Sequence, residues 1–335
     1  MSTDKVVERS SRGETFSIAS VTVAYNGVRV LPRHLDGLEK QSRQLDEIIV
    51  VNNASTDMTS ELLKARYPKI TVLNQPENGG VGGGFAVGLA YAAIQKQYDW
   101  IWLFDQDSVP KADALEVLLS ALQPLENAAS TAILAPVGVN EESDLAYSGH
   151  VWRNGLRPVT GKAAEQEICF VDAVISSGTL IRREAVERVG LPRADFFMDF
   201  VDYEYCLRLR HQGYTIAVVS ASHLDHAIGD PLRVTAFGLQ KVWTYHPPWR
   251  EYYMTRNQIF TVWNYYPDWK AKSATMLQLL RHLIALLLFG KRKLACLKMI
   301  FRGVSDGLSG RLGIRPFGRS ADETMLNESL SGINP

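Results

Sequence analysis

The residues Trp100-Ile101-Trp102-Leu103-Phe104-Asp105-Gln106-Asp107-Ser108 form an apolar run that ends in two carboxylates separated by one residue. The run has the character of a buried β-strand. In an open α/β sheet, ligands bind beyond the carboxyl ends of the strands, and side chains at i and i+2 leave an extended segment on the same face. We therefore expect Asp105 and Asp107 to face one ligand. Paired carboxylates suit Mg²⁺ or Mn²⁺ bridging to phosphates, although the pattern also fits a solvated strand end or a turn.

Upstream of this run, segments with strand and helix character alternate. The order predicts a parallel sheet with crossover helices. From about residue 131 to 219 the alternation breaks down, so we expect the sheet to become mixed there. The expected strands are 16–25, 47–51, 70–73, 100–104, 132–134 and 171–180, and the expected helices are 31–41, 60–67, 85–97 and 183–189.

A glycine-rich segment, residues 78–84, precedes the helix expected at 85–97. A turn of this kind presents backbone N–H groups that suit a phosphate. It is not a Walker loop, because no Gly-Lys-Ser/Thr follows, and its glycines lack the spacing of a dinucleotide-binding loop. Close backbone packing against a ligand and a plain flexible turn both fit the segment.

The composition is that of a folded protein without a strong charge preference. Of 335 residues, 46% are hydrophobic and 21% charged, and 36 Lys plus Arg balance 36 Asp plus Glu. This balance gives no global field that favours nucleic acid, so we expect no nucleic-acid partner. Three cysteines without a Cys-x-x-Cys pair indicate neither a disulfide framework nor structural zinc, and the polar start of the chain does not resemble a secretory signal. We therefore expect a cytoplasmic location.

The C-terminal part contains a leucine-rich run within residues 273–301, interrupted by Arg281 and His282 and followed by Gly290-Lys291-Arg292-Lys293. Its uninterrupted apolar part is shorter than the ~20 residues that cross a bilayer. Two interpretations fit. One is a basic amphipathic helix pair lying on the inner face of the cytoplasmic membrane, and the other is a core or homo-oligomer helix with a solvated basic end.

Four motifs occur in order along the chain: Val23-Ala24-Tyr25-Asn26, residues 50–57 with the sequence VVNNASTD, Asn78-Gly79-Gly80 and Asp105-Gln106-Asp107-Ser108. Together they resemble the nucleotide-sugar half of the family 2 glycosyltransferases. The Asp-Gln-Asp-Ser form, with residues 199–208 and 226–229, looks most like bacterial rhamnosyltransferases of surface-polysaccharide assembly, such as O-antigen, and the related galactofuranosyltransferases. The resemblance covers residues 16–257.

The resemblance implies a nucleotide-diphospho-sugar transferase (GT-A) fold, of the α/β class, with a mixed, mostly parallel sheet flanked by helices and a C-terminal helical appendage. We accordingly expect a disordered tail at 1–14, a domain for nucleotide sugar and acceptor at 15–235, a helical region at 236–310 and a tail at 311–335. The implied reaction is sugar transfer from a nucleotide sugar with inversion at the anomeric carbon.

The resemblance also assigns residues to the nucleotide-sugar site. Asp57 matches the aspartate that contacts the pyrimidine base, although Ser55, Thr56 and Asp57 before a helix are also ordinary capping residues. Asp105 is expected near the sugar or ribose. The other residues expected on the nucleotide-sugar side are Tyr25, Asn26, Asn53, Gly80, Gln106 and Arg256, the last as a bidentate diphosphate ligand or as part of the core.

For the metal, the resemblance implies Asp107 and His226 as ligands of Mg²⁺ or Mn²⁺, with His223 as a competitor for the histidine position. Asp202 matches the general base that takes the proton from the acceptor hydroxyl. Glu204 is expected to bind acceptor or to buttress the site, with intrahelical pairing to Arg208 as the alternative. Trp249 is expected to stack on a sugar or to pack the C-terminal helices.

The resulting hypothesis is a cytoplasmic, peripherally membrane-associated, metal-dependent inverting enzyme. It moves L-rhamnose from dTDP-rhamnose to a lipid-linked saccharide. The alternatives are a galactofuranosyl or hexosyl transferase that uses a UDP-sugar, and a catalytically silent saccharide-binding homologue.

Overall fold

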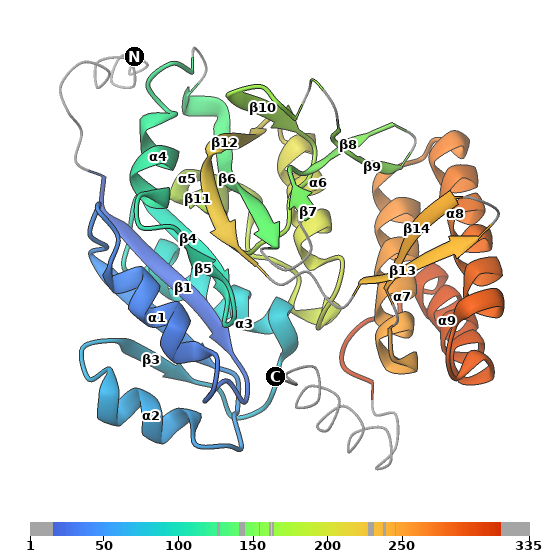
Figure 1. Ribbon diagram of the computed structural model, residues 1–335, viewed down its shortest axis with the longest axis horizontal. Coiled ribbons are helices and arrows are strands. Elements are labelled where there is room, and N and C mark those ends of the chain that lie inside the picture. The colour runs from blue at the N-terminus through green and yellow to red at the C-terminus, as the bar shows by residue number, and fades with distance from the viewer. Residues whose placement is uncertain are drawn as a thin grey trace, which may run out of the picture.

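The computed structural model describes residues 16–125, 128–140, 145–153, 155–160, 162, 164–226, 231–236, 239–244 and 246–315. The tail expected at 1–14 and the last twenty residues of the tail expected at 311–335 lie outside this part of the chain. Figure 1 shows a central sheet between helices and, beside it, a group of long C-terminal helices. This arrangement is the α/β fold with a helical appendage that the sequence predicts.

The sheet has the strand order β3-β2-β1-β4-β11-β6-β12-β10. Strands β1 to β4 run parallel to one another, whereas β11 is antiparallel to both β4 and β6. The sheet therefore becomes mixed, as expected. Its strands are β1 (Ile18–Ala24), β2 (Glu47–Asn52), β3 (Thr71–Asn74), β4 (Trp100–Asp105), β6 (Thr131–Asn140), β10 (Ile168–Val171), β11 (Leu180–Arg182) and β12 (Thr215–Asp225), with β5 (Val109–Pro110) on β12 and β7 (Leu145–Tyr147) on β6.

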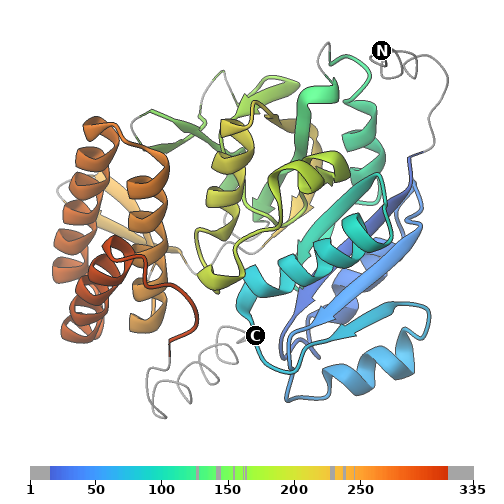
Figure 2. The same ribbon diagram turned by 180° about the vertical axis from the view of Figure 1, so that it is seen from behind.

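Alternate residues of the strands build two cores, one on each face of the sheet. In β4, Ile101 and Leu103 belong to one core, and Trp100, Trp102 and Phe104 belong to the other. This is the period of two expected for a strand buried on both faces. The first core is covered by α3 (Gly80–Leu89), the π-helical segment η1 (Ala90–Gln95), α5 (Arg183–Val189) and α6 (Val201–His211), and the second by α1 (Leu31–Glu39), α2 (Thr59–Arg66) and α4 (Ala114–Ser120). Figure 2, the view from behind, shows the first group of helices lying across the near face of the sheet.

Two expected elements differ in the structure. Helix α3 begins at Gly80, inside the segment expected to be a turn. A Cβ on Gly84 would lie 2.5 Å from Cγ1 of Val23 in β1, so this glycine allows close helix–strand packing. The strand expected at 171–180 is also wrong over most of its length, because β10 ends at Val171 and β11 starts at Leu180. The loop between them turns to the site described below.

Beyond the sheet, the chain forms two β-hairpins and three helices. Hairpin β8 (His150–Trp152)–β9 (Leu156–Pro158) precedes β10, and hairpin β13 (Pro231–Ala236)–β14 (Leu239–Thr244) opens the region expected to be purely helical. The helices are α7 (Pro248–Tyr265), α8 (Trp269–Phe289) and α9 (Lys293–Leu308). Helix α8 continues through Arg281 and His282, and by length and composition it is the one described helix that could cross a membrane. It shares this property with the core helices of many soluble proteins.

Candidate active site

Two carboxylates lie at the carboxyl end of β4, where the sequence places them. Asp107 is exposed, and Asp105 is partly buried. Burial and the neighbouring Asp107 raise the pKa of Asp105 to about 6, while the charges of His226 and Arg250 oppose the shift. The site thus concentrates negative charge beyond a strand end, and two basic side chains offset part of it.

A chain of hydroxyl groups fixes the histidine beside these carboxylates. The backbone N–H of Asp105 donates to Oγ of Ser177 (3.1 Å), which bonds to Oγ of Ser108 (2.7 Å), and this hydroxyl bonds to Nδ1 of His226 (2.6 Å). The chain uses Nδ1, so Nε2 of His226 is the nitrogen left for a ligand. His223 is exposed and bonds to the carbonyl of Ala221 through Nδ1 (3.0 Å). Of the two histidines, His226 is therefore the one at the site.

A second histidine, His34, which the sequence analysis did not single out, forms a hydrogen bond with the backbone of Ser108. His34 of α1 is fully buried, and its ring nitrogens bond to Oγ1 of Thr22 (2.8 Å) and to the carbonyl of Ser108 (2.5 Å). Burial lowers the pKa of His34 to about 4, so the ring is neutral at physiological pH. The neutral ring ties β1 and α1 to the Asp105-Gln106-Asp107-Ser108 turn.

The residues expected around the base form a network between the ends of β1 and β2. The Gln106 amide pairs with the backbone of Tyr25, accepting from its N–H (2.9 Å) and donating to its carbonyl (3.1 Å). Oδ1 of Asn26 accepts from the N–H groups of Thr56 (2.8 Å) and Asp57 (3.3 Å). Asn26 adopts a positive φ of 49°, as its short polar side chain permits. The network positions this loop, and base contact by Tyr25, Asn26 and Gln106 stays a prediction.

Asp57 holds the start of α2, although the N-cap position itself is Met58. Its carboxylate accepts from the N–H and hydroxyl of Thr59, at the start of α2, and from the N–H of Val28 (3.2 Å). The side chain is neither buried nor fully exposed. Contact with a pyrimidine base is compatible with this position but stays a prediction.

Two other residues expected to bind the nucleotide sugar, Asn53 and Gly80, make structural contacts within the protein. Asn53 is 2% exposed, and its amide bonds to the side chain of Asn78 (3.0 Å), the carbonyl of Gly80 (2.9 Å) and the N–H of Gly79 (3.0 Å). Gly80 has φ +68°, and a Cβ there would lie 2.1 Å from the carbonyl oxygen of Phe197. These residues pack the start of α3 against the loop before α6, and their contact with the nucleotide sugar stays a prediction.

That loop is held in an unusual conformation directly before the expected base. Phe197, Asp199 and Phe200 all have positive φ, at 65°, 52° and 64°. The Nδ2 group of Asn257 in α7 donates to the carbonyls of Met198 (2.7 Å) and Asp199 (2.8 Å) and to that of the preceding Phe196. Strained backbone of this kind persists only where surrounding contacts determine it, and it is common at functional sites.

Arg250, at the start of α7, clamps the same loop. Its guanidinium bonds to both carboxylate oxygens of Asp199, with Nε at 3.0 Å from Oδ2 and a terminal nitrogen at 2.9 Å from Oδ1. The charge of Asp199 raises the pKa of Arg250, and Asp105 adds to the effect. Arg250 therefore lies in the field of the β4 carboxylates, a position that the sequence analysis assigned to Arg256.

Asp202 stands in the first turn of α6, and Oδ1 accepts from the N–H of Tyr203 (2.9 Å). It borders a small cavity lined largely by apolar side chains, among them Phe85, Leu103 and Val174. Burial raises the pKa of Asp202 to about 7, opposed by the Tyr203 N–H and assisted by the charges of Asp105 and Asp199. A carboxylate with a pKa near neutrality is suited to general-base chemistry.

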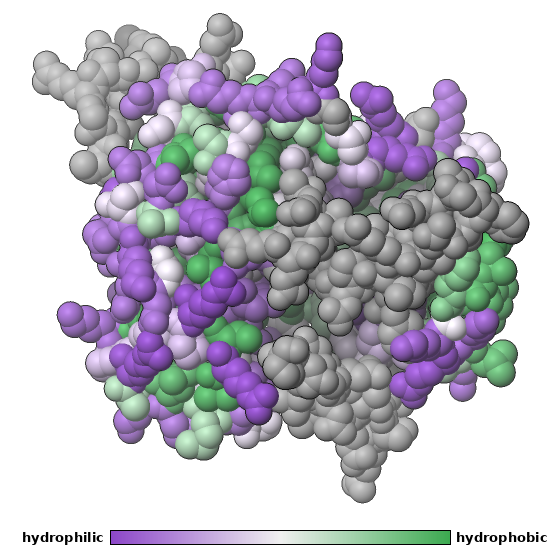
Figure 3. All heavy atoms as spheres, in the orientation of Figure 1, coloured by the Kyte–Doolittle hydropathy of each residue, from purple (hydrophilic) through white to green (hydrophobic). Residues whose placement is uncertain are grey.

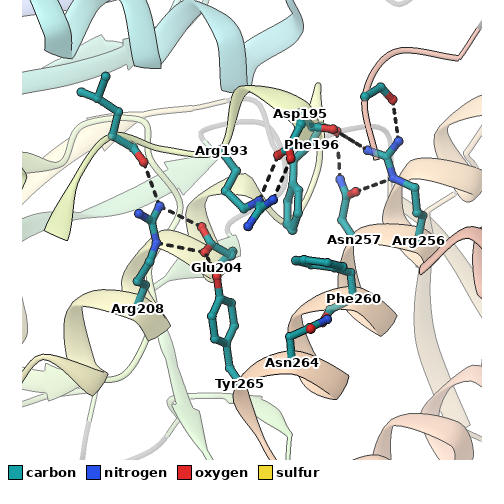
Figure 4. Close-up of polar contacts among 12 residues, drawn as sticks. Arg193, Asp195, Phe196, Glu204, Arg208, Arg256, Asn257, Phe260, Asn264 and Tyr265 are labelled. Atoms are coloured by element: carbon teal, nitrogen blue, oxygen red, sulfur yellow. Dashed lines mark hydrogen bonds and ion pairs between the residues drawn. The ribbon is translucent and has the colours of Figure 1, made fainter. Parts of the chain in front are cut away.

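Glu204, two positions later, does not face a ligand. It is fully buried and forms a bidentate ion pair with Arg208, at 3.0 and 3.2 Å, as Figure 4 shows. The hydroxyl of Tyr265 in α7 donates to Oε1 at 2.6 Å. The expectation that Glu204 binds acceptor is corrected, because all of these contacts are internal, and the pairing alternative holds.

Arg256 is also an interior residue, and Trp249 is partly buried. The guanidinium of Arg256 is fully buried and donates to the carbonyls of Gly313 (2.6 Å), Asp195 (3.1 Å) and Phe196 (2.9 Å), among the contacts drawn in Figure 4. Trp249 packs in a cluster with Phe197, Tyr252 and Tyr253. The expectation that Arg256 holds a diphosphate is wrong for this geometry. The packing alternative for Trp249 fits its cluster, and stacking of its remaining exposed part on a sugar stays a prediction.

Comparison with known proteins identifies the family. The model of the family described as glycosyl transferase family 2 matches residues 20–190, about half of the chain. This chain belongs to glycosyl transferase family 2. The matched segment of the glycosyltransferase contains β1 to β4, the two carboxylates and the serine pair that links them to His226.

Several relatives resemble this glycosyltransferase over much of its length. The dTDP-rhamnosyl transferase RfbF of Shigella flexneri is 26% identical over 299 residues, 89% of this chain and 97% of that protein. Galactofuranosyltransferase GlfT1 of Mycolicibacterium smegmatis is 29% identical over 219 residues, 63% of this chain and 71% of that protein.

Solved structures share the fold. GalNAc-T7 with UDP, GalNAc and Mn²⁺ aligns with a TM-score of 0.59 and 14% identity, over 88% of this chain and 56% of that one. A fragment of S. aureus TarS in complex with UDP-GlcNAc aligns with a TM-score of 0.55 and 16% identity, over 88% of this chain and 81% of that one. At these identities the likeness establishes the GT-A fold.

The residues of the glycosyltransferase fit a divalent cation only in part. Within the described ranges, no three His, Cys, Asp or Glu side chains converge as a preformed metal site. Asp107 and His226 nevertheless both act on Asp105, whose pKa is raised chiefly by burial and then by the charge of Asp107, and lowered by His226. Mg²⁺ and Mn²⁺ commonly use one or two carboxylates plus substrate phosphates, so an incomplete protein set fits such an ion.

Proposed function

We propose that this glycosyltransferase transfers L-rhamnose from dTDP-rhamnose to a lipid-linked saccharide, with inversion at the anomeric carbon and with a divalent cation. The observation that carries the chemistry is the position and pKa of Asp202. Its carboxyl group has a pKa of about 7 and lies close enough to Asp105 for the two charges to interact. The donor is proposed from RfbF, which is matched over nearly its whole length. GalNAc-T7, whose structure contains Mn²⁺, supports the cation.

In the proposed reaction, the Asp202 carboxylate takes the proton of an acceptor hydroxyl as the hydroxyl oxygen attacks the anomeric carbon. The bond between that carbon and the diphosphate oxygen breaks on the opposite face, and dTDP leaves. Asp107 and Nε2 of His226 would hold the cation, which when bound supplies Lewis-acid stabilisation of the leaving diphosphate. Arg250, whose positive charge acts on Asp105, would add to the stabilisation of the leaving diphosphate.

A UDP-sugar donor is the second candidate. GlfT1 of M. smegmatis is slightly more identical than RfbF but is matched over less of its length. The chemistry of Asp202 and the β4 carboxylates would be the same, because a deoxyhexose and a hexose differ only by a hydroxyl that other contacts must recognise.

A thermal-shift panel separates these donors. The native protein is heated with dTDP-rhamnose, UDP-galactofuranose, UDP-glucose or the free nucleotides, each with Mn²⁺ or EDTA. A ligand of the folded state raises the midpoint by an amount that grows with the logarithm of its concentration relative to its Kd. The proposal expects the largest metal-dependent shift with dTDP-rhamnose. A larger shift with a UDP-sugar would favour the second candidate, and no shift with any donor would favour a silent homologue.

We also propose that α8 and α9 hold the enzyme on an anionic lipid surface at the inner face of the cytoplasmic membrane. Along α8, the side chains of Leu277, Leu280, Ile284, Leu287 and Leu288 are 47–62% exposed. Figure 3 shows hydrophobic side chains gathered at the edge of the molecule over the C-terminal helices. The opposite side of α8 packs inward, where Nε2 of His282 bonds to Glu251 of α7 (2.7 Å).

The charge of this region complements anionic lipid. Residues 269–308 contain eight Lys or Arg and one Asp, and residues 291–293 between α8 and α9 are all exposed and basic. An exposed apolar face with adjacent basic residues is typical of a helix lying in a membrane interface. Packing of α8 on α7 favours this arrangement over a span.

Sedimentation with vesicles tests this docking. The wild-type protein should pellet with phosphatidylglycerol vesicles and less with pure phosphatidylcholine, and reversing residues 291–293 to Glu should abolish the difference. Reversal of Lys40, Lys64 and Lys69, which are exposed on and beside α1 and α2, is the control with the same charge change. Equal binding by both triple variants would refute the proposal, and a concentration-dependent dimer without vesicle binding would identify the face as an oligomer contact.

A further inference from the structure

A cavity of about 280 Å³ lies between the sheet domain and the C-terminal helices. Its walls come from hairpin β8–β9, the strained loop before α6, the first turn of α6, and helices α7 and α8. This volume is near the lower end of the roughly 300–1,000 Å³ typical of small-molecule sites. The cavity therefore suits a sugar unit rather than a complete nucleotide sugar.

The cavity lies beside the start of α6, which carries the proposed base, although Asp202 itself lines the smaller apolar cavity described above and not this one. Asp199 and Phe200 on one side of Asp202 in the chain, and Tyr203 on the other, all line it. The carboxylates at the end of β4 are not among its lining residues. A ligand in this cavity would thus lie on the α7 and α8 side of the chain segment that carries Asp202, whereas the β4 carboxylates belong to the donor side.

The lining has the chemistry that recognises a saccharide. Aromatic rings of His150, Trp152 and Tyr203 supply flat apolar faces, and the amides of Gln258 and Gln278 supply donors and acceptors for hydroxyl groups. The two amides meet across the opening between α7 and α8, with Nε2 of Gln258 3.3 Å from Oε1 of Gln278.

The aromatic wall is held by contacts between its own rings and with residues outside the cavity. Trp152 stacks on Tyr266 at 3.9 Å with an interplanar angle of 14°, which joins hairpin β8–β9 to the end of α7. The His150 ring lies edge-on to Tyr203 at 5.3 Å, and its Nδ1 bonds to the hydroxyl of Tyr147 (2.7 Å). These rings are fixed before any ligand arrives, which reduces the entropy lost on binding.

Helix α8 connects this cavity to the lipid-facing surface. Thr275 and Gln278 line the cavity, whereas Leu277, Leu280 and Ile284 of the same helix point outward and are exposed. We propose that the cavity binds the terminal sugar of the acceptor, and that α8 places it where a lipid-linked saccharide reaches Asp202 from the membrane surface. This inference rests on the proposed function.

The test uses the full-length protein and methyl glycosides of rhamnose, galactose, glucose and N-acetylglucosamine as probes. Saturation-transfer NMR measures their binding without a donor. The wild type should bind at least one of them, and Gln258→Leu with Gln278→Leu should weaken that binding about tenfold, because two hydrogen bonds of ordinary strength are removed. Gln278→Trp, which fills the cavity from an exposed position, should block it.

Gln123→Leu is the matched control, since Gln123 is an exposed residue just after α4 and does not line the cavity. Thermal shifts with the donor should be the same in all four proteins. Binding of none of the glycosides by the wild type, or equal binding by the control and the cavity variants, would overturn the inference. Because the binding readout needs no donor, a wrong donor assignment would appear separately, as the absence of any donor-induced shift.

Discussion

Replacement of Asp202 by Asn tests the proposed base through two independent quantities. The amide has nearly the same shape but cannot accept a proton. General-base catalysis contributes roughly a hundred- to ten-thousand-fold in rate, so kcat should fall by that factor while donor affinity changes only a few-fold. Turnover is measured as release of nucleotide diphosphate at saturating donor.

The same substitution should stabilise the fold at neutral and alkaline pH. Folding raises the pKa of Asp202 from 3.8 to about 7, because burial disfavours the ionised form. The unfolded state therefore loses its proton first as the pH rises, and the native protein loses stability between about pH 4 and pH 7. At about 1.4 kcal/mol per pKa unit, the loss above pH 7 reaches at most roughly 4 kcal/mol.

Urea unfolding at pH 4 and pH 8 measures this effect. Asp202→Asn and the wild type should be almost equally stable at pH 4, and the variant should be more stable at pH 8. Asp113→Asn, at an exposed aspartate, is the control and should follow the wild type at both values. Wild-type kcat/KM should also rise with pH to a plateau, with a midpoint near 7. Residual transfer close to the wild-type rate, or no gain in stability at pH 8, would refute the assignment.

Three further substitutions probe other parts of the site. Asp107→Ala should remove the Mn²⁺-dependent part of the donor thermal shift and leave the shift in EDTA unchanged; a retained metal effect would exclude Asp107 as a ligand. Arg208→Ala should lower the free energy of unfolding by about 3–5 kcal/mol in urea titrations, since it leaves the buried Glu204 carboxylate without its ion-pair partner, and a loss below 1 kcal/mol would contradict this. Gly80→Ala should destabilise the protein by at least ~1 kcal/mol, because of its positive φ and the clash with the carbonyl of Phe197, whereas Gly83→Ala, with open space around it, is the control.

The sequence predicted the first half of the fold well, because local patterns determine it. Buried strands, crossover helices and the carboxylates after β4 follow from period-two alternation and strand-end position. The helix start at Gly80 was missed, since glycine is a poor helix former in isolation. Tertiary packing makes this segment helical. A Cβ at Gly84 or Gly88 would clash with the valines of β1, so α3 can pack on this strand only because these positions are glycine.

The site was predicted where residue identity carries the chemistry, and missed where geometry carries it. Asp105 and His226 lie together, yet Ser177, which links them through Ser108, is 72 residues from Asp105 and has no motif of its own. Arg256 was a reasonable candidate by residue type. Its hydrogen bonds to buried carbonyl groups show that Arg256 has a structural role. Arg250, in the same helix, has the solvent exposure expected of a site residue and lies close enough to Asp105 for their charges to interact.

The most direct test of the account is ³¹P NMR of dTDP-rhamnose after incubation with the wild-type enzyme and the methyl glycosides, with Mn²⁺ or with EDTA. Each reaction is quenched and brought to excess EDTA before the spectrum is recorded, because free Mn²⁺ is paramagnetic and broadens phosphate resonances. The account predicts that dTDP forms with Mn²⁺, does not form with EDTA, and does not form with Asp202→Asn under either condition. Formation of dTDP at the wild-type rate by Asp202→Asn would contradict the assigned base. No nucleotide diphosphate from dTDP-rhamnose or from any UDP-sugar would contradict the account as a whole.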